Sequence, residues 1–102
     1  MEQQANPNIL LVGVGGIGGM TIELLAPALE RIQRTCTITL MDGDIVESTN
    51  LGHQRFTKLD IGSPKTEVLA SRFADFEYVT CHSVPENLRT AEQLEDYDFI
   101  LI

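Results

Sequence analysis

The segment that most constrains the fold is an apolar run followed directly by glycines. "NILLVGV" covers residues 8–14, and "GVGGIGG" covers residues 13–19. A short, nearly continuous apolar run predicts a strand buried on both faces, as in a parallel sheet. Apolar residues at helical spacing follow over residues 17–33. A strand, a glycine turn and a helix in this order predict the first unit of a doubly wound α/β domain.

The rest of the chain repeats this alternation. Strands are predicted over residues 36–42, 77–83 and 97–102, and a helix over residues 63–76, with Ser63 as its N-cap and Pro64 as its first residue. Residues 84–96 predict a turn and a short helix. We therefore expect residues 1–102 to form a Rossmann-like, three-layer α/β/α half-domain, whose parallel sheet has the strand order 3-2-1-4. The helix over 17–33 is expected to face the sheet with Ile17, Met20, Thr21, Leu24, Leu25, Ala28, Leu29 and Ile32.

Composition excludes several classes of protein. The chain has 102 residues and a net charge of −8, which indicates one domain at most and argues against a general nucleic-acid partner. It contains no apolar run of about 18 residues, so no membrane span is expected. The start, "MEQQANPN", is unlike a signal peptide, so a cytoplasmic protein is predicted. Cys36 and Cys81 have no metal-ligand spacing, so no zinc site is expected within this chain. They are interpreted as small buried strand residues, with a catalytic cysteine as the weaker alternative.

The glycine segment predicts a nucleotide site. Gly13, Gly15 and Gly18 fit the pattern G-x-G-x-x-G between a strand and a helix, and Gly16 lies within it. In this pattern the first glycine permits the turn, the second lets the backbone approach a phosphate, and the third allows close packing of helix on strand. The helix N-terminus adds N–H donors. A turn without a ligand is the alternative, and the motif does not by itself name the nucleotide.

Two carboxylates follow the second predicted strand. Asp42 comes 24 residues after Gly18, where a carboxylate can accept hydrogen bonds from ribose hydroxyls. Asp44 could support a metal ion or shape the turn, and both interpretations are open. The irregular segment 43–62 is longer than most connections, which predicts a functional loop. A nicotinamide-dependent dehydrogenase domain would account for the glycines and Asp42.

The loop after Asp42 favours another class of enzyme. The run "DGDIVESTNLGHQRF", with "DIGSPK" after it, resembles the pattern D-x-D-x-V-x-x-S-N-L-x-R-Q…D-x-G-x-x-K of the ubiquitin-activating-enzyme-like superfamily, which includes the ThiF, MoeB and HesA proteins. The resemblance covers about residues 8–102 and is most specific over residues 42–65. The positions that match in order are Asp42, Asp44, Val46, Asn50, Leu51, Gln54, Asp60, Gly62 and Lys65.

The resemblance implies ATP-dependent adenylation. Members of the family bind ATP and Mg²⁺ and activate the C-terminal carboxylate of a small ubiquitin-like or sulfur-carrier protein as an acyl adenylate. By position, Asp42 would hold the ribose, Asn50 and Lys65 would contact the phosphates as the catalytic residues, and Gln54 would support the loop. Cationic and amide donors would stabilise the charge that develops on the phosphate oxygens. The parent protein would be an adenylyltransferase, and residues 1–102 alone are expected to be inactive.

Some features depart from the family pattern. His53 stands where the family has an arginine, and histidine is mostly neutral at pH 7. Arg55 is a possible substitute in the nucleotide site, and a degenerate relative that only binds a partner is the alternative. The family's upstream arginine and its later aspartate, cysteine and zinc motifs are not in the sequence, so an N-terminal fragment is expected. The apolar fourth strand is expected to pair two copies through residues 97–102 as a homodimer.

Overall fold

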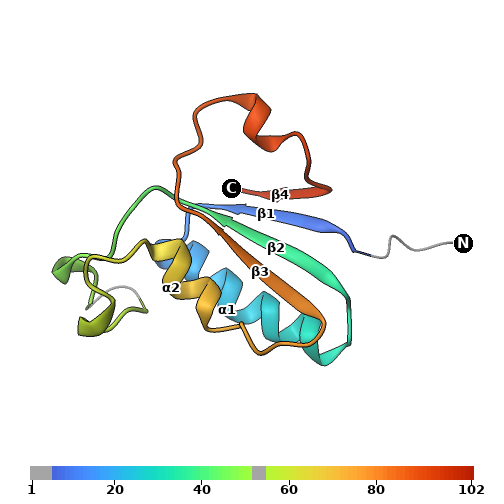
Figure 1. Ribbon diagram of the computed structural model, residues 1–102, viewed down its shortest axis with the longest axis horizontal. Helices are drawn as coiled ribbons and strands as arrows, with labels where there is room; N and C mark the ends of the chain where they lie inside the picture. The colour runs from blue at the N-terminus through green and yellow to red at the C-terminus, as the bar shows by residue number, and fades with distance from the viewer. Residues whose placement is uncertain (1–5, 52–54) are drawn as a thin grey trace, which may run out of the picture.

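The computed structural model describes residues 6–51 and 55–102 and confirms the predicted fold class (Figure 1). Four strands form one parallel sheet in the order β3-β2-β1-β4. The elements are β1 (Asn8–Val12), α1 (Gly16–Arg31), β2 (Cys36–Met41), η1 (Ser48–Asn50), η2 (Lys58–Asp60), α2 (Lys65–Ser71), β3 (Val79–Val84), η3 (Ala91–Leu94) and β4 (Phe99–Leu101), where η denotes a 3₁₀ helix.

Both α-helices pack against the same side of the sheet, and the connection that carries η3 lies on the far side of β4 from them (Figure 1). The register places Leu10 of β1 beside Thr39 of β2 and Ile100 of β4. Since every strand runs in the same direction, the carboxyl ends of β1, β2 and β3 meet at one edge of the sheet. The glycine turn and the loop after Met41 both begin at that edge, where ligands bind in folds of this type.

The core lies between the sheet and the two α-helices. Ile22 of α1 and Leu69 of α2 have no exposed surface, and they pack into one cluster with Ile38 and Leu40 of β2. Burying each such side chain contributes roughly 1.5–3 kcal/mol. The buried members of the cluster are Leu11, Val14, Ile22, Ala26, Cys36, Ile38, Leu40, Val46, Phe56, Leu69, Phe73 and Val79.

The face of α1 that meets the sheet differs from the predicted one. Its buried residues are Gly19, Ile22 and Ala26, whereas Ile17 and Leu24 are 84% and 68% exposed. Small residues explain the difference. A Cβ added at Gly18 would overlap the backbone carbonyl of Gly13, and one at Gly19 would lie 3.3 Å from the carbonyl oxygen of Val14. Through these glycines, α1 closely approaches the backbone of Gly13 and Val14, and five of the eight residues of the expected apolar stripe face outward. The stripe residues that are exposed are Ile17, Met20, Leu24, Ala28 and Ile32.

Helix α2 is shorter than predicted. It begins at Lys65 with Pro64 as its N-cap, and it ends at Ser71. Pro64 takes the N-cap position in place of Ser63, and the backbone carbonyl of Ser63 accepts a hydrogen bond from the N–H of Val46, 2.8 Å away, within the loop. After Ser71, backbone N–H groups bond to carbonyls three residues back, and the α-helical turn tightens.

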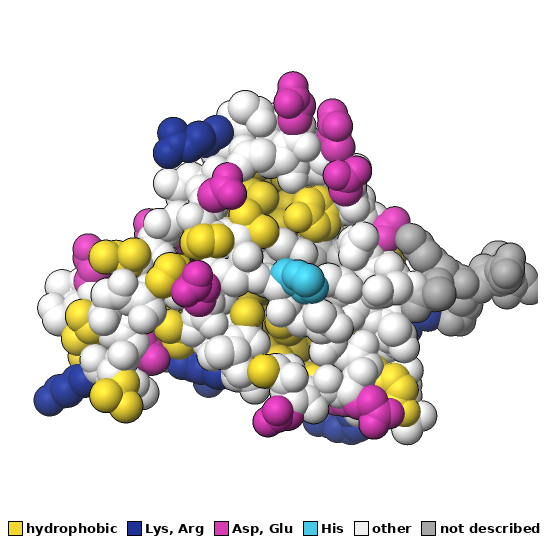
Figure 2. All heavy atoms as spheres, viewed as in Figure 1, with side chains coloured by type: hydrophobic (Ala, Val, Ile, Leu, Met, Phe, Trp, Pro, Cys, Tyr) yellow, Lys and Arg dark blue, Asp and Glu magenta, His cyan; other side chains and the backbone are white. Residues whose placement is uncertain are grey.

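The connection from β3 to β4 contains only the 3₁₀ helix η3, together with exposed acidic side chains (Figure 2). Strand β4 is the edge of the sheet, and its apolar residues are open to solvent, with Phe99 61% exposed and Leu101 41% exposed. Within the described residues, none of the helices has the length and apolar character needed to cross a lipid bilayer.

Candidate functional site

The glycine turn has the geometry that its sequence predicts. Gly13 has a φ of 87°, which L-residues rarely adopt, and its N–H donates to the carbonyl of Met41, 2.8 Å away. Gly15 is the N-cap of α1, and Gly16 is the first helical residue. Helix α1 has 16 residues and is long enough to present its N-terminus to an anion.

Asp42 joins the glycine turn to the loop after β2. Its Oδ2 atom accepts from the N–H of Val14 at 2.9 Å, and its Oδ1 atom accepts from the N–H of Asp44 at 2.9 Å. The carboxylate is partly buried, and each oxygen keeps a lone pair that can accept another hydrogen bond. The two backbone bonds fix its orientation, as a ribose-binding carboxylate requires.

A hollow of about 310 Å³ opens beside this turn. Three of the residues expected in the site, Asp44, Asn50 and Lys65, line it together. They come from the loop after β2, from η1 and from the first position of α2. The structure thus brings together side chains that are separated by up to 21 residues in sequence. The remaining lining residues are Gly43, Ile45 and Glu47.

Lys65 is the cation of this hollow. Its side chain is 6% exposed, and its Nζ atom lies 3.5 Å from Oδ2 of Asp44, whose side chain is 65% exposed. The backbone N–H of Lys65 donates to the carbonyl of Asp44, so both ends of the residue are tied to the turn. A nearly buried ammonium with one long, solvent-facing ion pair retains donors for a further anion.

Asn50 presents a donor to the same hollow. Its Oδ1 atom accepts from the N–H of Glu47 at 2.8 Å, and its own N–H donates to the carbonyl of Glu47. Because a backbone N–H occupies the amide oxygen, the Nδ2 group is the end left for a ligand. The hollow therefore combines an ammonium and an amide donor with the carboxylates of Asp44 and Glu47.

The glycines line a second hollow, of about 390 Å³, which is mostly apolar. Gly13 and Gly18 line it together with Leu101 and Ile102. Val14 of the glycine turn and Asp44 of the first hollow are both bonded to Asp42. The predicted phosphate-binding turn and the lysine hollow are thus linked through one carboxylate.

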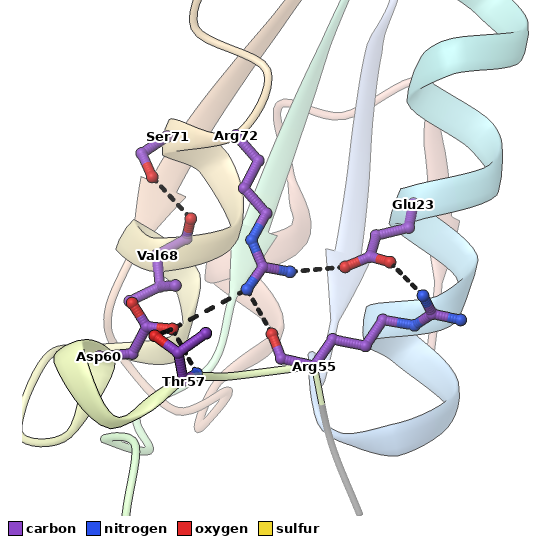
Figure 3. Close-up of polar contacts among 7 residues, drawn as sticks. All are labelled: Glu23, Arg55, Thr57, Asp60, Val68, Ser71 and Arg72. Carbon is purple, nitrogen blue, oxygen red and sulfur yellow. Dashed lines mark hydrogen bonds and ion pairs between the residues drawn. The ribbon is translucent and has the colours of Figure 1, made fainter. Parts of the chain in front are cut away.

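Arg55 lies in a clamp between the helices rather than along either hollow (Figure 3). Its Nη1 atom lies 2.7 Å from Oε2 of Glu23 on α1, and its side chain is 55% exposed. Nη1 of Arg72, next to the end of α2, lies 2.6 Å from Oε1 of the same glutamate. Arg72 also donates to the backbone carbonyl of Arg55 and lies 3.9 Å from Asp60. The clamp ties Arg55 and Asp60 to the two helices, and a nucleotide contact by Arg55 stays a prediction.

Gln54 and His53, on which two of the sequence expectations depend, lie outside the described residues. The two cysteines are free thiols on neighbouring strands. Burial, together with the nearby Cys36, raises the pKa of Cys81 to about 11, and burial raises the pKa of Cys36. Both sulfurs are therefore protonated at neutral pH, which disfavours a nucleophilic role.

Two contacts at the site were missed by the sequence analysis. Glu47 received no role in the sequence analysis, although its backbone orients Asn50 and it lines the hollow. Asn87, in the connection after β3, accepts a hydrogen bond from the N–H of Gly43 at 2.9 Å. The two residues of this second pair are 44 positions apart, so no local pattern relates them.

Comparison with known proteins decides the family. The ThiF family matches this chain over residues 1–102. The chain belongs to the ThiF family. Its relatives include the tRNA threonylcarbamoyladenosine dehydratase of Bacillus subtilis (strain 168), 30% identical over 108 residues, which cover 99% of this chain and 40% of the relative. The catalytic subunit of the NEDD8-activating enzyme E1 of Caenorhabditis elegans is 31% identical over 97 residues, which cover 94% of this chain and 21% of the relative.

Solved structures support the same placement. The E. coli tRNA N6-threonylcarbamoyladenosine dehydratase, solved in complex with ATP, superposes with a TM-score of 0.71 at 27% identity, over 92% of this chain and 39% of that protein. The ThiF-family chain thus spans less than half the length of these relatives. The expected resemblance to the adenylating superfamily is confirmed at the level of family and fold.

Proposed function

We propose that this ThiF-family chain binds ATP through the carboxyl edge of its sheet. The observation that carries the proposal is the nearly buried Lys65 in one hollow with Asp44 and Asn50, joined through Asp42 to the glycine turn. In this arrangement Asp42 holds the ribose, while Lys65, the Asn50 amide and the N-terminus of α1 face the phosphates. The ATP complex of the E. coli relative adds support from within the same fold.

Mg²⁺ is proposed as the accompanying metal. Mg²⁺ binds through one or two carboxylates together with substrate phosphates and water, and it neutralises developing phosphate charge. Asp44 and Glu47 place two carboxylates in the hollow beside Lys65, which fits this ligand set. Asp44 would then exchange its long ion pair with Lys65 for the metal, which leaves the ammonium for the phosphates.

The proposed reaction is adenylation of a carboxylate. An oxygen of the carboxylate attacks the α-phosphorus, a new C(O)–O–P bond forms, and the bond between the α- and β-phosphates breaks to release pyrophosphate. A carboxylate is already a nucleophile, so no side-chain base is required. Lys65 and Asn50 would stabilise the charge that builds on the phosphate oxygens, since donors fixed before the reaction need no reorganisation.

The proposed substrate is the C-terminal carboxylate of a small ubiquitin-like or sulfur-carrier protein. The similarity to the catalytic subunit of a NEDD8-activating enzyme supports this class. Since the chain spans 40% and 21% of the curated relatives, nucleotide binding is proposed for residues 1–102, and adenylation for the protein in which they act.

Homodimer formation is proposed through the exposed edge strand β4. Phe99, Ile100 and Leu101 are 39–61% exposed at the edge of the sheet, and an apolar edge strand readily pairs with another chain. Sedimentation of the chain at high micromolar concentration tests this, with a dimer expected. A single monomeric species at that concentration would refute the pairing.

ATP–pyrophosphate exchange tests the adenylation step. Exchange of labelled pyrophosphate into ATP is expected only when the protein that contains this chain is mixed with its carboxylate substrate. The Lys65→Ala variant is expected to lose the exchange, whereas Lys58→Ala, which changes an exposed lysine outside the hollow, is expected to retain it. Full exchange by Lys65→Ala would refute the role given to this lysine.

A further inference from the structure

The connection after β3 reaches across to the turn that lines the lysine hollow. Oδ1 of Asn87 accepts the N–H of Gly43 at 2.9 Å. Gly43 separates Asp42 from Asp44 and itself lines the hollow. The central peptide of the turn is thus bonded to a side chain that neither the glycine motif nor the loop motif contains.

Gly43 leaves space for Asn87. A Cβ added at Gly43 would lie 2.5 Å from Oδ1, 2.6 Å from Cγ and 2.8 Å from Nδ2 of Asn87. The φ of Gly43 lies outside the left-handed region, unlike that of Gly13 or Gly62. The absence of a side chain is therefore needed here for the close approach of the asparagine and not for the backbone conformation. Gly43 and Asn87 form a matched pair.

Asn87 is itself held in place. Nε2 of Gln93 donates to the carbonyl of Asn87 at 3.1 Å. Oε1 of the same glutamine accepts the N–H groups of Arg89 and Thr90 at 2.6 and 2.8 Å. Gln93 lies in η3, so the connection folds on itself around this amide and presents Asn87 from a fixed turn.

We infer that Asn87 is a positioning residue, which sets the Asp42–Gly43–Asp44 turn of the nucleotide site through the Gly43 N–H. The inference rests on the proposed ATP site. Asp42 is oriented by the N–H groups of Val14 and Asp44, and Asn87 supplies the third bond, to the peptide between the two aspartates. Without it, the turn keeps only the bonds of the flanking aspartates, which include the bond from the N–H of Lys65 to the carbonyl of Asp44. The position of Asp42 and Asp44 relative to Lys65 is then less firmly held. A neutral amide accepts this N–H without adding a third carboxylate to the turn.

The first test compares ATP affinities of variants by calorimetry. Loss of one neutral hydrogen bond corresponds to about a fivefold effect, so Asn87→Ala is expected to bind ATP about fivefold more weakly. Asn87→Asp keeps the acceptor but adds a negative charge, which repels ATP. Its loss of ATP affinity is therefore expected to shrink in 0.5 M NaCl, whereas the loss in Asn87→Ala is expected to persist. The control Asn6→Ala removes an asparagine bonded to Thr37, before β1, and should leave the affinity unchanged. Equal ATP affinity of Asn87→Ala and the unmodified chain overturns the inference.

The second test needs no nucleotide. Exchange of the Gly43 amide proton, followed by NMR, is expected to quicken about fivefold in Asn87→Ala. Gly43→Ala is expected to lower the melting temperature, because the added Cβ clashes with the side chain of Asn87. In the double variant, Asn87→Ala removes that side chain and is expected to restore part of the lost melting temperature. Unchanged Gly43 exchange, or additive effects in the double variant, overturns the inference even if ATP binds. Failure of the unmodified chain to bind ATP refutes the proposed function instead, and the exchange and the double variant then decide the role of Asn87 in the turn.

Discussion

The ammonium of Lys65 lies 3.5 Å from the carboxylate of Asp44, and the first side chain is almost fully buried while the second is largely exposed. Such a pair is weak as an ion pair, because solvent screens the exposed carboxylate. It is better suited to holding the ammonium until a phosphate replaces Asp44. Lys65→Ala is therefore expected to weaken ATP binding about 10–100-fold, the loss typical of hydrogen bonds to a charged group, as measured by calorimetry. Binding that matches the unmodified chain would exclude this role.

Asp42 is expected to matter for stability as well as for ATP. In the unmodified chain, the N–H groups of Val14 and Asp44 each donate to one oxygen of Asp42. In Asp42→Asn, the NH₂ group replaces one of these oxygens, so one of the two backbone N–H groups loses its acceptor. One unsatisfied, partly buried donor costs about 1–3 kcal/mol of the free energy of unfolding. Urea denaturation should detect this loss, and the control Asp75→Asn, at an exposed position after α2, should change stability little. Equal stabilities of the two variants would contradict the geometry of the turn.

The clamp in Figure 3 predicts that its two arginines contribute unequally to the free energy of unfolding. Arg72 bonds both Glu23 and the carbonyl of Arg55 and is 31% exposed, whereas the side chain of Arg55 has one ion pair and is 55% exposed. Arg72→Ala is expected to lower the free energy of unfolding by about 1–3 kcal/mol, and Arg55→Ala by less than about 1 kcal/mol. Chemical denaturation of both variants measures this, and the reverse order would refute the clamp.

Glu30, near the end of α1, is expected to contribute to the loss of stability at acid pH. Desolvation tends to raise the pKa of Glu30, but hydrogen bonds from the N–H groups of Glu77, Tyr78 and Val79 together hold the pKa below its ordinary value of 4.5. A carboxyl group with a lowered pKa in the fold stabilises it above pH 4.5, and this contribution disappears as the pH falls through the lowered value. Melting temperatures from pH 7 to pH 3 should fall less steeply in Glu30→Gln. An unchanged pH profile would contradict this prediction.

The sequence predicted the architecture well and the packing of α1 poorly. Strand order follows from alternation and right-handed crossovers, and Asp44, Asn50 and Lys65 come together because all follow the carboxyl edge of the sheet. The prediction of the buried face of α1 was wrong because it gave more weight to large apolar residues than to Gly19 and Ala26. The small size of these two residues lets the helix approach the sheet closely. The contacts of Asn87 with Gly43 and of Glu30 with β3 depend on tertiary structure, so spacing along the chain cannot indicate them.

The central claim is that the carboxyl edge of this sheet is an ATP site built around Lys65. The most direct measurement is a calorimetric titration of the chain with ATP and Mg²⁺, with NAD in a parallel titration and Lys65→Ala as the matched variant. We predict saturable binding of ATP at one site, no saturable binding of NAD, and ATP binding that is about 10–100-fold weaker in Lys65→Ala. Binding of NAD without ATP, or ATP binding that Lys65→Ala leaves unchanged, would contradict the claim.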